Sequence, residues 1–183
     1  WGFTQAQQDC SEFVRAAILW LDSPEIDLKW ERRFEHAGTT RCHDCSHACM
    51  PVILQFTPQL STMDVCKLDD LLHHWHQANG MRAALLRAAP IVCIHVDRLT
   101  ASETGQIEKS SCAIELDAET TIPVFNATGT DCEPVSYLPI AAASHQGLDQ
   151  AGHYQALLKI QPTVLSAHPV KWLLTQDNMP PLA

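Results

Sequence analysis

Two stretches of the chain have the hydrophobic spacing of amphipathic helices. The apolar residues of the first stretch, residues 8–21, recur at steps of three and four; they are Cys10, Val14, Ala17, Ile18 and Leu21. Pro24 ends this predicted helix. The second stretch has the same spacing at Val65, Leu68, Leu71, Leu72 and Trp75. Asn79 and Gly80 mark its end, and residues 81–89 form either a short helix or an irregular segment before Pro90.

Beyond Pro90 the pattern changes to that of strands. Runs rich in β-branched residues, or alternating between apolar and polar positions, predict about six short strands. They lie at residues 91–96, 112–116, 121–125, 137–143, 153–160 and 170–174. A meander of this kind favours an antiparallel sheet. Helices followed by strands predict an α+β fold.

Composition narrows the class of protein. The 183 residues are 46% apolar and 18% charged, which excludes a disordered tail and allows a hydrophobic core. No apolar run approaches the roughly 18 residues that a membrane span needs, so we expect no membrane partner. The formal charge of −9 disfavours nucleic acid and favours a basic partner. The eight scattered cysteines indicate reduced thiols and an intracellular location, in cytoplasm or nucleus.

Two sequence motifs near opposite ends of the chain belong together. Residues 7–13 read Gln-Gln-Asp-Cys-Ser-Glu-Phe. Residues 145–147 read His-Gln-Gly and residues 152–154 read Gly-His-Tyr, followed by Trp172 and Asp177. In this order the motifs resemble those of the ubiquitin-specific proteases, a family of papain-like cysteine isopeptidases. Residues 90–99 and 105–109 also resemble family segments, although Leu99 stands where the family has an aromatic residue.

The resemblance implies a partial papain-like cysteine protease domain over residues 1–183. Residues 1–30 would form a helix at the thumb end, and residues 31–66 a degenerate finger region. Residues 67–183 would form a helix and an antiparallel palm sheet. The family's nucleophile lies in an Asn-x-x-Cys-aromatic motif, and none of the eight cysteines here is followed by an aromatic residue. We therefore expect a fragment whose nucleophilic cysteine lies upstream of Trp1, and which is inactive alone.

The resemblance also assigns catalytic roles. His153 is the candidate general base, since an imidazole can accept and return the proton of a thiol. The family usually places the residue that orients this imidazole four positions after the tryptophan, where the chain has Gln176. Asp177 is the next residue, so either Asp177 takes the role or the site is weakened, because a glutamine carries no charge. The alternative to an enzyme is therefore a catalytically inactive module that binds ubiquitin.

Five residues are expected to bind the substrate, ubiquitin or a ubiquitinated protein. His145, Gly152 and Tyr154 would line a narrow cleft for the diglycine end of ubiquitin. Asp9 and Glu12 would contact arginines of its tail. Two carboxylates in the first turn of a helix also stabilise the helix dipole without any ligand, so a structural role for this pair stays open.

The Cys-x-x-Cys pair at Cys42 and Cys45 is half of a zinc site. No second such pair follows; the nearest substitutes are His47, Cys49, Cys66, His73 and His76. We expect a degenerate finger with no cofactor, with Cys42 and Cys45 as weak zinc candidates. A third hypothesis is a small zinc-binding interaction domain whose Gly-His-Tyr sequence is due to chance.

Overall fold

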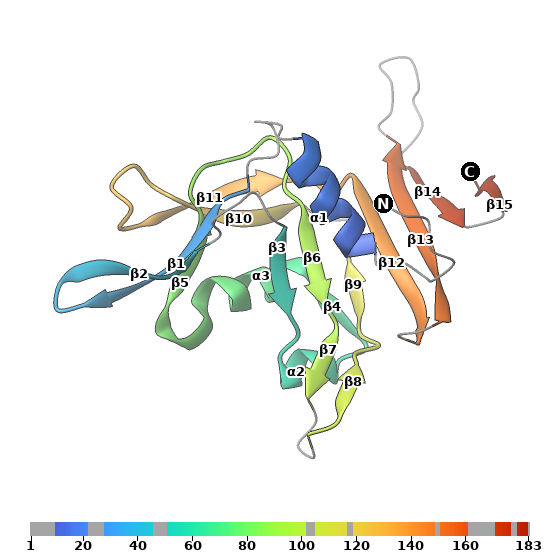
Figure 1. The fold of residues 1–183 in the computed structure, drawn as a ribbon, viewed down its shortest axis with the longest axis horizontal. Helices are drawn as coiled ribbons and strands as arrows, with labels where there is room; N and C mark the ends of the chain where they lie inside the picture. Colours follow the sequence, from blue (N-terminus) through green and yellow to red (C-terminus); the bar gives the residue numbers. More distant parts are fainter. Residues whose placement is uncertain are drawn as a thin grey trace. The chain divides into compact units, whose positions relative to one another are not determined.

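The structure is a computed structural model of the chain. It describes residues 10–21, 28–45, 51–101, 105–116, 119–148, 151–160, 171–176 and 179–182. Its elements in chain order are shown in Figure 1. The chain divides into two compact units: Trp1–Val14 with Leu138–Ala183, and Arg15–Tyr137. Among the described residues, no helix combines the length and the apolar character that crossing a bilayer requires.

The described residues form the α-helices α1 (Cys10–Leu21), α2 (Pro58–Ser61) and α3 (Leu68–Gln77), and the 3-10 helix η2 (Ala78–Gly80). The strands of the larger unit are β1 (Trp30–His36), β2 (Thr39–Cys45), β3 (Val52–Gln55), β4 (Val65–Lys67), β5 (Arg82–Leu85), β6 (Ile94–Asp97), β7 (Leu99–Ala101), β8 (Ile107–Lys109), β9 (Ala113–Glu115), β10 (Thr120–Phe125) and β11 (Cys132–Tyr137). The other unit holds β12 (Ala141–Leu148), β13 (Ala151–Ile160), β14 (Lys171–Gln176) and β15 (Met179–Leu182).

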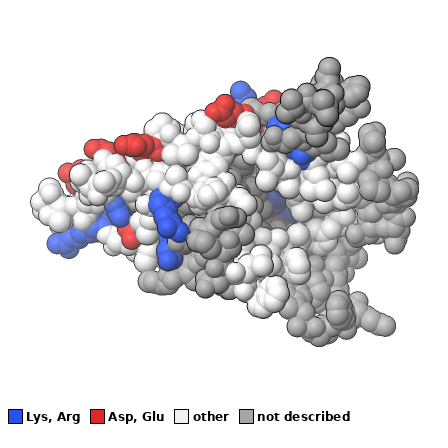
Figure 2. Space-filling model, turned by 90° about the horizontal axis from the view of Figure 1, so that it is seen from above, with Lys and Arg blue, Asp and Glu red and all other residues white. Residues whose placement is uncertain are grey.

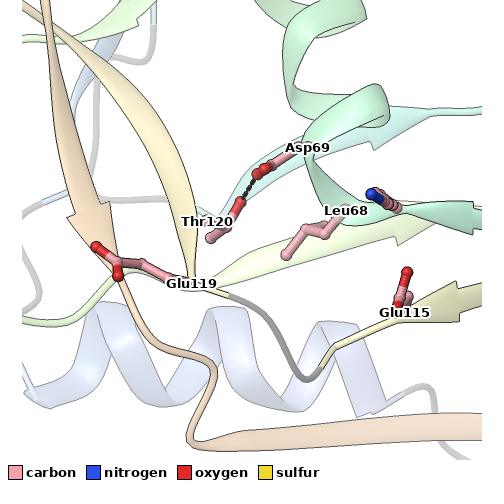
Figure 3. Close-up of a pocket in the computed structure, with 6 residues that line it drawn as sticks. Leu68, Asp69, Glu115, Glu119 and Thr120 are labelled. Atoms are coloured by element: carbon pink, nitrogen blue, oxygen red, sulfur yellow. Dashed lines mark hydrogen bonds between the residues drawn. The ribbon is translucent and has the colours of Figure 1, made fainter.

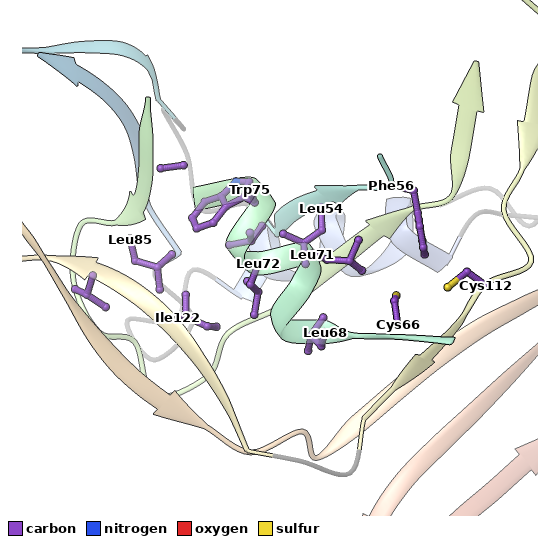
Figure 4. Packing of buried hydrophobic residues seen from close by; sticks show 13 residues of the cluster. Leu54, Phe56, Cys66, Leu68, Leu71, Leu72, Trp75, Leu85, Cys112 and Ile122 are labelled. Atoms are coloured by element: carbon purple, nitrogen blue, oxygen red, sulfur yellow. The ribbon is translucent and has the colours of Figure 1, made fainter. Parts of the chain in front are cut away.

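The core of the larger unit lies between α3 and a five-stranded sheet of order β11-β10-β5-β1-β2. Neighbouring strands are antiparallel except β10 and β5, which are parallel. The helix buries its apolar stripe of Leu68, Leu71, Leu72 and Trp75, the residues seen around the centre of Figure 4. The Trp75 ring meets Trp30 of β1 edge to face, with ring centroids 6.2 Å apart.

The strand β5 runs through the middle of the sheet although its sequence looks helical. Ala83, Ala84 and Leu85 are fully buried between β1 and a parallel contact with β10. The small alanines let the neighbouring layers approach closely, and pairing on both sides overrides their helix propensity. Neither expectation for residues 81–89, a short helix or an irregular segment, holds for Arg82–Leu85, and the parallel pairing of β5 with β10 departs from the predicted antiparallel sheet.

Two other predicted elements need correction. The second helix begins at Leu68, because Val65–Lys67 forms the strand β4, parallel to β9. A carboxylate oxygen of Asp70 accepts the backbone N–H of Lys67 at 3.1 Å and so fixes the start of α3. The predicted strand at residues 137–143 is split between β11 and β12; Pro139, which has no N–H for a sheet ladder, lies in the gap.

The hairpin of β1 and β2 forms an extended finger. Its two-residue turn places Ala37 at φ +51° and Gly38 at φ +71°, both in the left-handed region. Along the hairpin Arg33 pairs with Cys42 and Arg32 with Asp44, so His43 has no partner position. His43 is therefore the extra residue of a β-bulge.

Arg33 ties the finger to the loop between β10 and β11. Its Nε donates to Glu31 at 2.7 Å, and its Nη1 donates to the backbone oxygen of Gly129 at 2.5 Å. The guanidinium also lies 3.9 Å from the centre of the Phe125 ring. The side chain of Arg33 thus joins β1 to β10 and to the loop between β10 and β11.

The smaller unit contains an antiparallel sheet of order β12-β13-β14-β15. This agrees with the antiparallel arrangement predicted for the end of the chain. The last strand, β15, contains Pro180 and Pro181 in succession. In coarse form the predicted α+β class holds, with mixed sheets and few helices. The division of the chain at residues 30 and 66 stays a prediction.

Candidate functional site

The motif residues near the end of the chain lie on the paired strands β12 and β13. His145 is directly opposite Tyr154, and Gln146 is directly opposite His153. The rings of His145 and Tyr154 are 4.8 Å apart between centroids with an interplanar angle of 34°. Both rings are half-buried, and their contact holds the tyrosine against the neighbouring strand.

Tyr154 also reaches the beginning of α1. The backbone N–H of Cys10, the first residue of this helix, donates to the Tyr154 hydroxyl at 3.1 Å, across a sequence separation of 144 residues. Cys10 and Tyr154 belong to the same compact unit. The two motifs recognised in the sequence therefore meet in space.

His153 is exposed and follows the Gly152 position that pairs with Gly147. Because side chains alternate along a strand, His153 and Tyr154 are on opposite faces of the sheet. Glu12 lies in the first turn of α1 and is also exposed. Asp9 falls outside the described residues, so only one of the two predicted carboxylates can be placed.

The residue that would orient His153 is only partly defined. Position 176 of β14 pairs with Gln155, two residues along β13 from His153. Asp177 lies outside the described residues. Position 176 thus lies two register positions from His153, and the choice between Gln176 and Asp177 as the orienting residue stays a prediction.

The thiols of Cys42 and Cys45 lie on one face of the finger because of the bulge at His43. Three residues apart, they would face opposite ways on a regular strand, but here they pair with Arg33 and Glu31, which share a face. Partial burial first, then the charge of Glu31 and the neighbouring Cys45 thiol, raise the pKa of Cys42. The Cys42 thiol donates to the backbone oxygen of Asp44 at 3.4 Å.

Two thiols alone are an incomplete zinc site. Within the described ranges, no group of three or more His, Cys, Asp or Glu side chains could hold a metal ion. Of the substitutes, Cys66 is buried in the core, whereas His47 and Cys49 lie outside the described residues. His76 on α3 uses its Nδ1 in a 2.7 Å contact with the Ala83 oxygen. Zinc binding at Cys42 and Cys45 stays a prediction.

A small hollow of about 20 Å³ in the larger unit is shown in Figure 3. It is lined by Lys67, Leu68, Asp69, Glu115, Glu119 and Thr120. The Thr120 hydroxyl donates to the Asp69 carboxylate. This volume holds about one water molecule and is far below the roughly 300 Å³ of a small-molecule site.

Charged groups are unevenly distributed over the surface. On the face drawn in Figure 2, acidic side chains at the left gather mainly along one border and basic ones mainly below them. The net charge of −9 is therefore not spread evenly over the surface. A basic partner would bind where acidic side chains are exposed, as Glu12 is.

Sequence reasoning missed the two contacts that organise these regions. The hydrogen bond from Cys10 to Tyr154 joins residues far apart in the chain, so no local pattern predicts it. The only related signal is the pair of rings at His145 and Tyr154, which contact each other across the two strands. The bulge at His43 depends on the pairing with β1. The one sequence signal for this bulge is the Cys-x-x-Cys spacing inside a strand. Both thiols can share a face of the strand only if the strand contains an extra residue between them.

Comparisons with known proteins identify the fold and leave the family open. No family model matches the sequence, and no curated protein matches it. The structure is similar to three solved structures of the SAGA Ubp8/Sgf11/Sus1/Sgf73 deubiquitinase (DUB) module. That bound to ubiquitin aldehyde has a TM-score of 0.65 and 16% identity, covering 97% of this chain and 46% of that chain. The structure of the module bound to monoubiquitin has a TM-score of 0.62 and 16% identity, and the match covers 95% of this chain and 44% of that chain. A third structure of the module has a TM-score of 0.60 and 18% identity, and the match covers 97% of this chain and 45% of that chain.

The chain thus spans less than half the length of the chains it matches, at 44–46%. At this level of identity the likeness concerns the fold. Nearly the whole of the chain, from 95% to 97%, has the backbone arrangement of part of a deubiquitinase module.

Proposed function

We propose that this chain is part of a papain-like deubiquitinase domain of the ubiquitin-specific protease type, which hydrolyses isopeptide bonds at the C-terminus of ubiquitin. Two observations support the proposal. The sequence carries the family's motifs in the family's order. The fold is similar to that of modules solved with ubiquitin aldehyde and with monoubiquitin.

The single observation that supports it most is the hydrogen bond between the Cys10 N–H and the Tyr154 hydroxyl. An enzyme of this type needs the acidic helix and the imidazole to serve one substrate end. A shared site predicts contact between residues 10 and 154, whereas a Gly-His-Tyr sequence that arose by chance does not require it. Their contact makes the two motifs parts of one local structure.

In the proposed reaction the nucleophile is a cysteine thiolate supplied by a segment upstream of residue 1. His153 takes the thiol proton, the thiolate attacks the isopeptide carbonyl, and the imidazolium returns the proton to the departing amine. Asp177 or Gln176 orients the imidazole. The 183-residue chain alone is proposed to bind ubiquitin without cleaving it.

Substrate binding is proposed to combine charge with a narrow passage. Glu12, exposed in the first turn of α1, and Asp9 pair with arginines of the tail of ubiquitin. Gly152 offers little bulk beside the passing diglycine end, and the stacked His145 and Tyr154 form a rigid wall. The scattered cysteines fit an intracellular setting, in which ubiquitin is conjugated.

A second candidate is a ubiquitin-binding module that has lost catalysis. The register places Gln176 two residues along from His153, where an uncharged side chain would stabilise an imidazolium less than a carboxylate. The two candidates share the tail-binding role and differ only in turnover.

Electrophile-tagged ubiquitin separates them. A longer protein that includes the upstream segment is expected to form a covalent adduct, and His153→Ala in the same protein is expected to abolish it. Monoubiquitin binding by a longer protein without an adduct identifies the inactive module. Absence of both binding and adduct refutes the proposed function.

A further inference from the structure

The start of α1 has an unusual source of stabilisation. The first backbone N–H groups of a helix have no partner within the helix, and a side chain just before the helix normally accepts one of them. Here the N–H of Cys10 donates to the hydroxyl of Tyr154, which lies on a strand of a distant part of the sequence. A hydroxyl of β13 therefore accepts the first N–H of α1 as the helix is described.

We propose that Tyr154 is a positioning residue: its hydroxyl fixes the acidic first turn of α1 against the strand that carries His153. This inference rests on the proposed function, since it explains how the tail-binding carboxylate and the general base keep their spacing. Tyr154 is bonded to His153 by a peptide link, and Glu12 follows Cys10 in the same helical turn. A short connected path thus runs from the first turn of α1 to the backbone of His153, whose imidazole projects from the other face of the sheet.

His145 makes this path stiff. Directly across the ladder, its ring contacts that of Tyr154 with centroids 4.8 Å apart and planes tilted by 34°, which restricts the side-chain conformations of the tyrosine. The ring contact thus favours the orientation in which the hydroxyl meets the Cys10 N–H. A freely rotating tyrosine would pay more conformational entropy to make the same hydrogen bond.

Tyr154→Phe is the sharpest test, because it removes the hydroxyl and keeps the ring stack. The chain offers a matched control in its other tyrosine: the Tyr137 hydroxyl donates to the Ala89 oxygen at 3.0 Å, within the larger unit. We expect Tyr154→Phe to weaken monoubiquitin binding about fivefold, the factor that corresponds to one neutral hydrogen bond of about 1 kcal/mol. Tyr137→Phe should leave binding unchanged.

A double-mutant cycle distinguishes positioning from general stability. Glu12→Gln is expected to weaken monoubiquitin binding in the wild-type chain. This effect should largely disappear in the Tyr154→Phe background, because the carboxylate is no longer held in place. Equal effects of Glu12→Gln in both backgrounds would overturn the positioning role.

Hydrogen exchange supplies a readout that needs no ubiquitin. Amides of residues 10–14 should exchange about fivefold faster in Tyr154→Phe than in the wild type or in Tyr137→Phe. Unchanged exchange overturns the inference even if ubiquitin binds. Faster exchange in a chain that does not bind monoubiquitin instead overturns the proposed function, and with it the role of Tyr154 in substrate binding, while confirming the cap itself.

Discussion

Replacing Gly129 by alanine tests the contact by which Arg33 ties the finger to its neighbouring loop. Gly129 has φ +71°, and a Cβ atom at this position would collide with the Nη1 atom of Arg33. Gly38 and Gly80 have the same φ of +71°, but a Cβ atom would meet nothing within 4 Å at either position. The three glycines therefore share the backbone strain and differ in the steric clash.

The magnitude follows from these two terms. Alanine in the left-handed region costs about 1–2 kcal/mol, and this is the whole expected loss at Gly38 and at Gly80. At Gly129 the guanidinium must also move away from the carbonyl oxygen that it contacts at 2.5 Å. Loss of such a charge-assisted hydrogen bond adds about 1.5–3 kcal/mol. The Arg33 side chain is only 19% exposed, so water replaces that bond poorly.

Urea unfolding followed by tryptophan fluorescence measures the three losses directly. We expect Gly129→Ala to lower the free energy of unfolding by about 1.5–3 kcal/mol more than Gly38→Ala or Gly80→Ala. In an Arg33→Ala background this excess should vanish. Equal losses for the three glycine variants, or an excess that persists without Arg33, would refute the reasoning.

Three further predictions concern other parts of the chain. Ala37→Asn should raise the melting temperature by about 2–4 °C, since asparagine tolerates the left-handed turn position better than alanine does. Burial, then the hydrogen-bonded Cys112 thiol, raises the pKa of the Cys66 thiol from 9.0 to about 12. The proton is thus held more tightly in the folded state, so this contribution to stability is full below about pH 9 and falls as the pH rises toward 12. Cys66→Ala should reduce the fall in the free energy of unfolding by about 2 kcal/mol near about pH 10.5, as measured from urea midpoints. Chelation with EDTA should leave the melting temperature unchanged if Cys42 and Cys45 hold no zinc, and a fall in that temperature would contradict the degenerate finger.

The helical patterns predicted packing better than they predicted boundaries. The stripe of α3 is buried at Leu71, Leu72 and Trp75 as its spacing indicated, because a regular helix presents those positions to one side. Leu21, at the end of the α1 stripe, is 56% exposed. Periodicity predicts which residues share a face of the helix. How much of that face is buried depends on the neighbouring elements.

The elements that were missed depend on pairing across the chain. Residues 82–85 became a strand because two other strands flank them, and no local signal in an alanine-rich segment reveals this. Similarly, β3 and β6 pair in parallel although many residues separate them. For the candidate site, the order of the motifs predicted that His145, Tyr154 and the start of α1 belong to one site. The hydrogen bond from Cys10 to Tyr154 could be found only in the structure.

The two successive prolines of β15 limit how the smaller sheet can associate. Backbone N–H groups point alternately to the two sides of a strand, so adjacent prolines remove one donor from each side. The outer border of β15, at the end of the strand order, therefore lacks a donor where an incoming strand would need one. Lateral growth of the sheet into fibres or swapped dimers is discouraged at this border by covalent structure alone, without any charged guard residue.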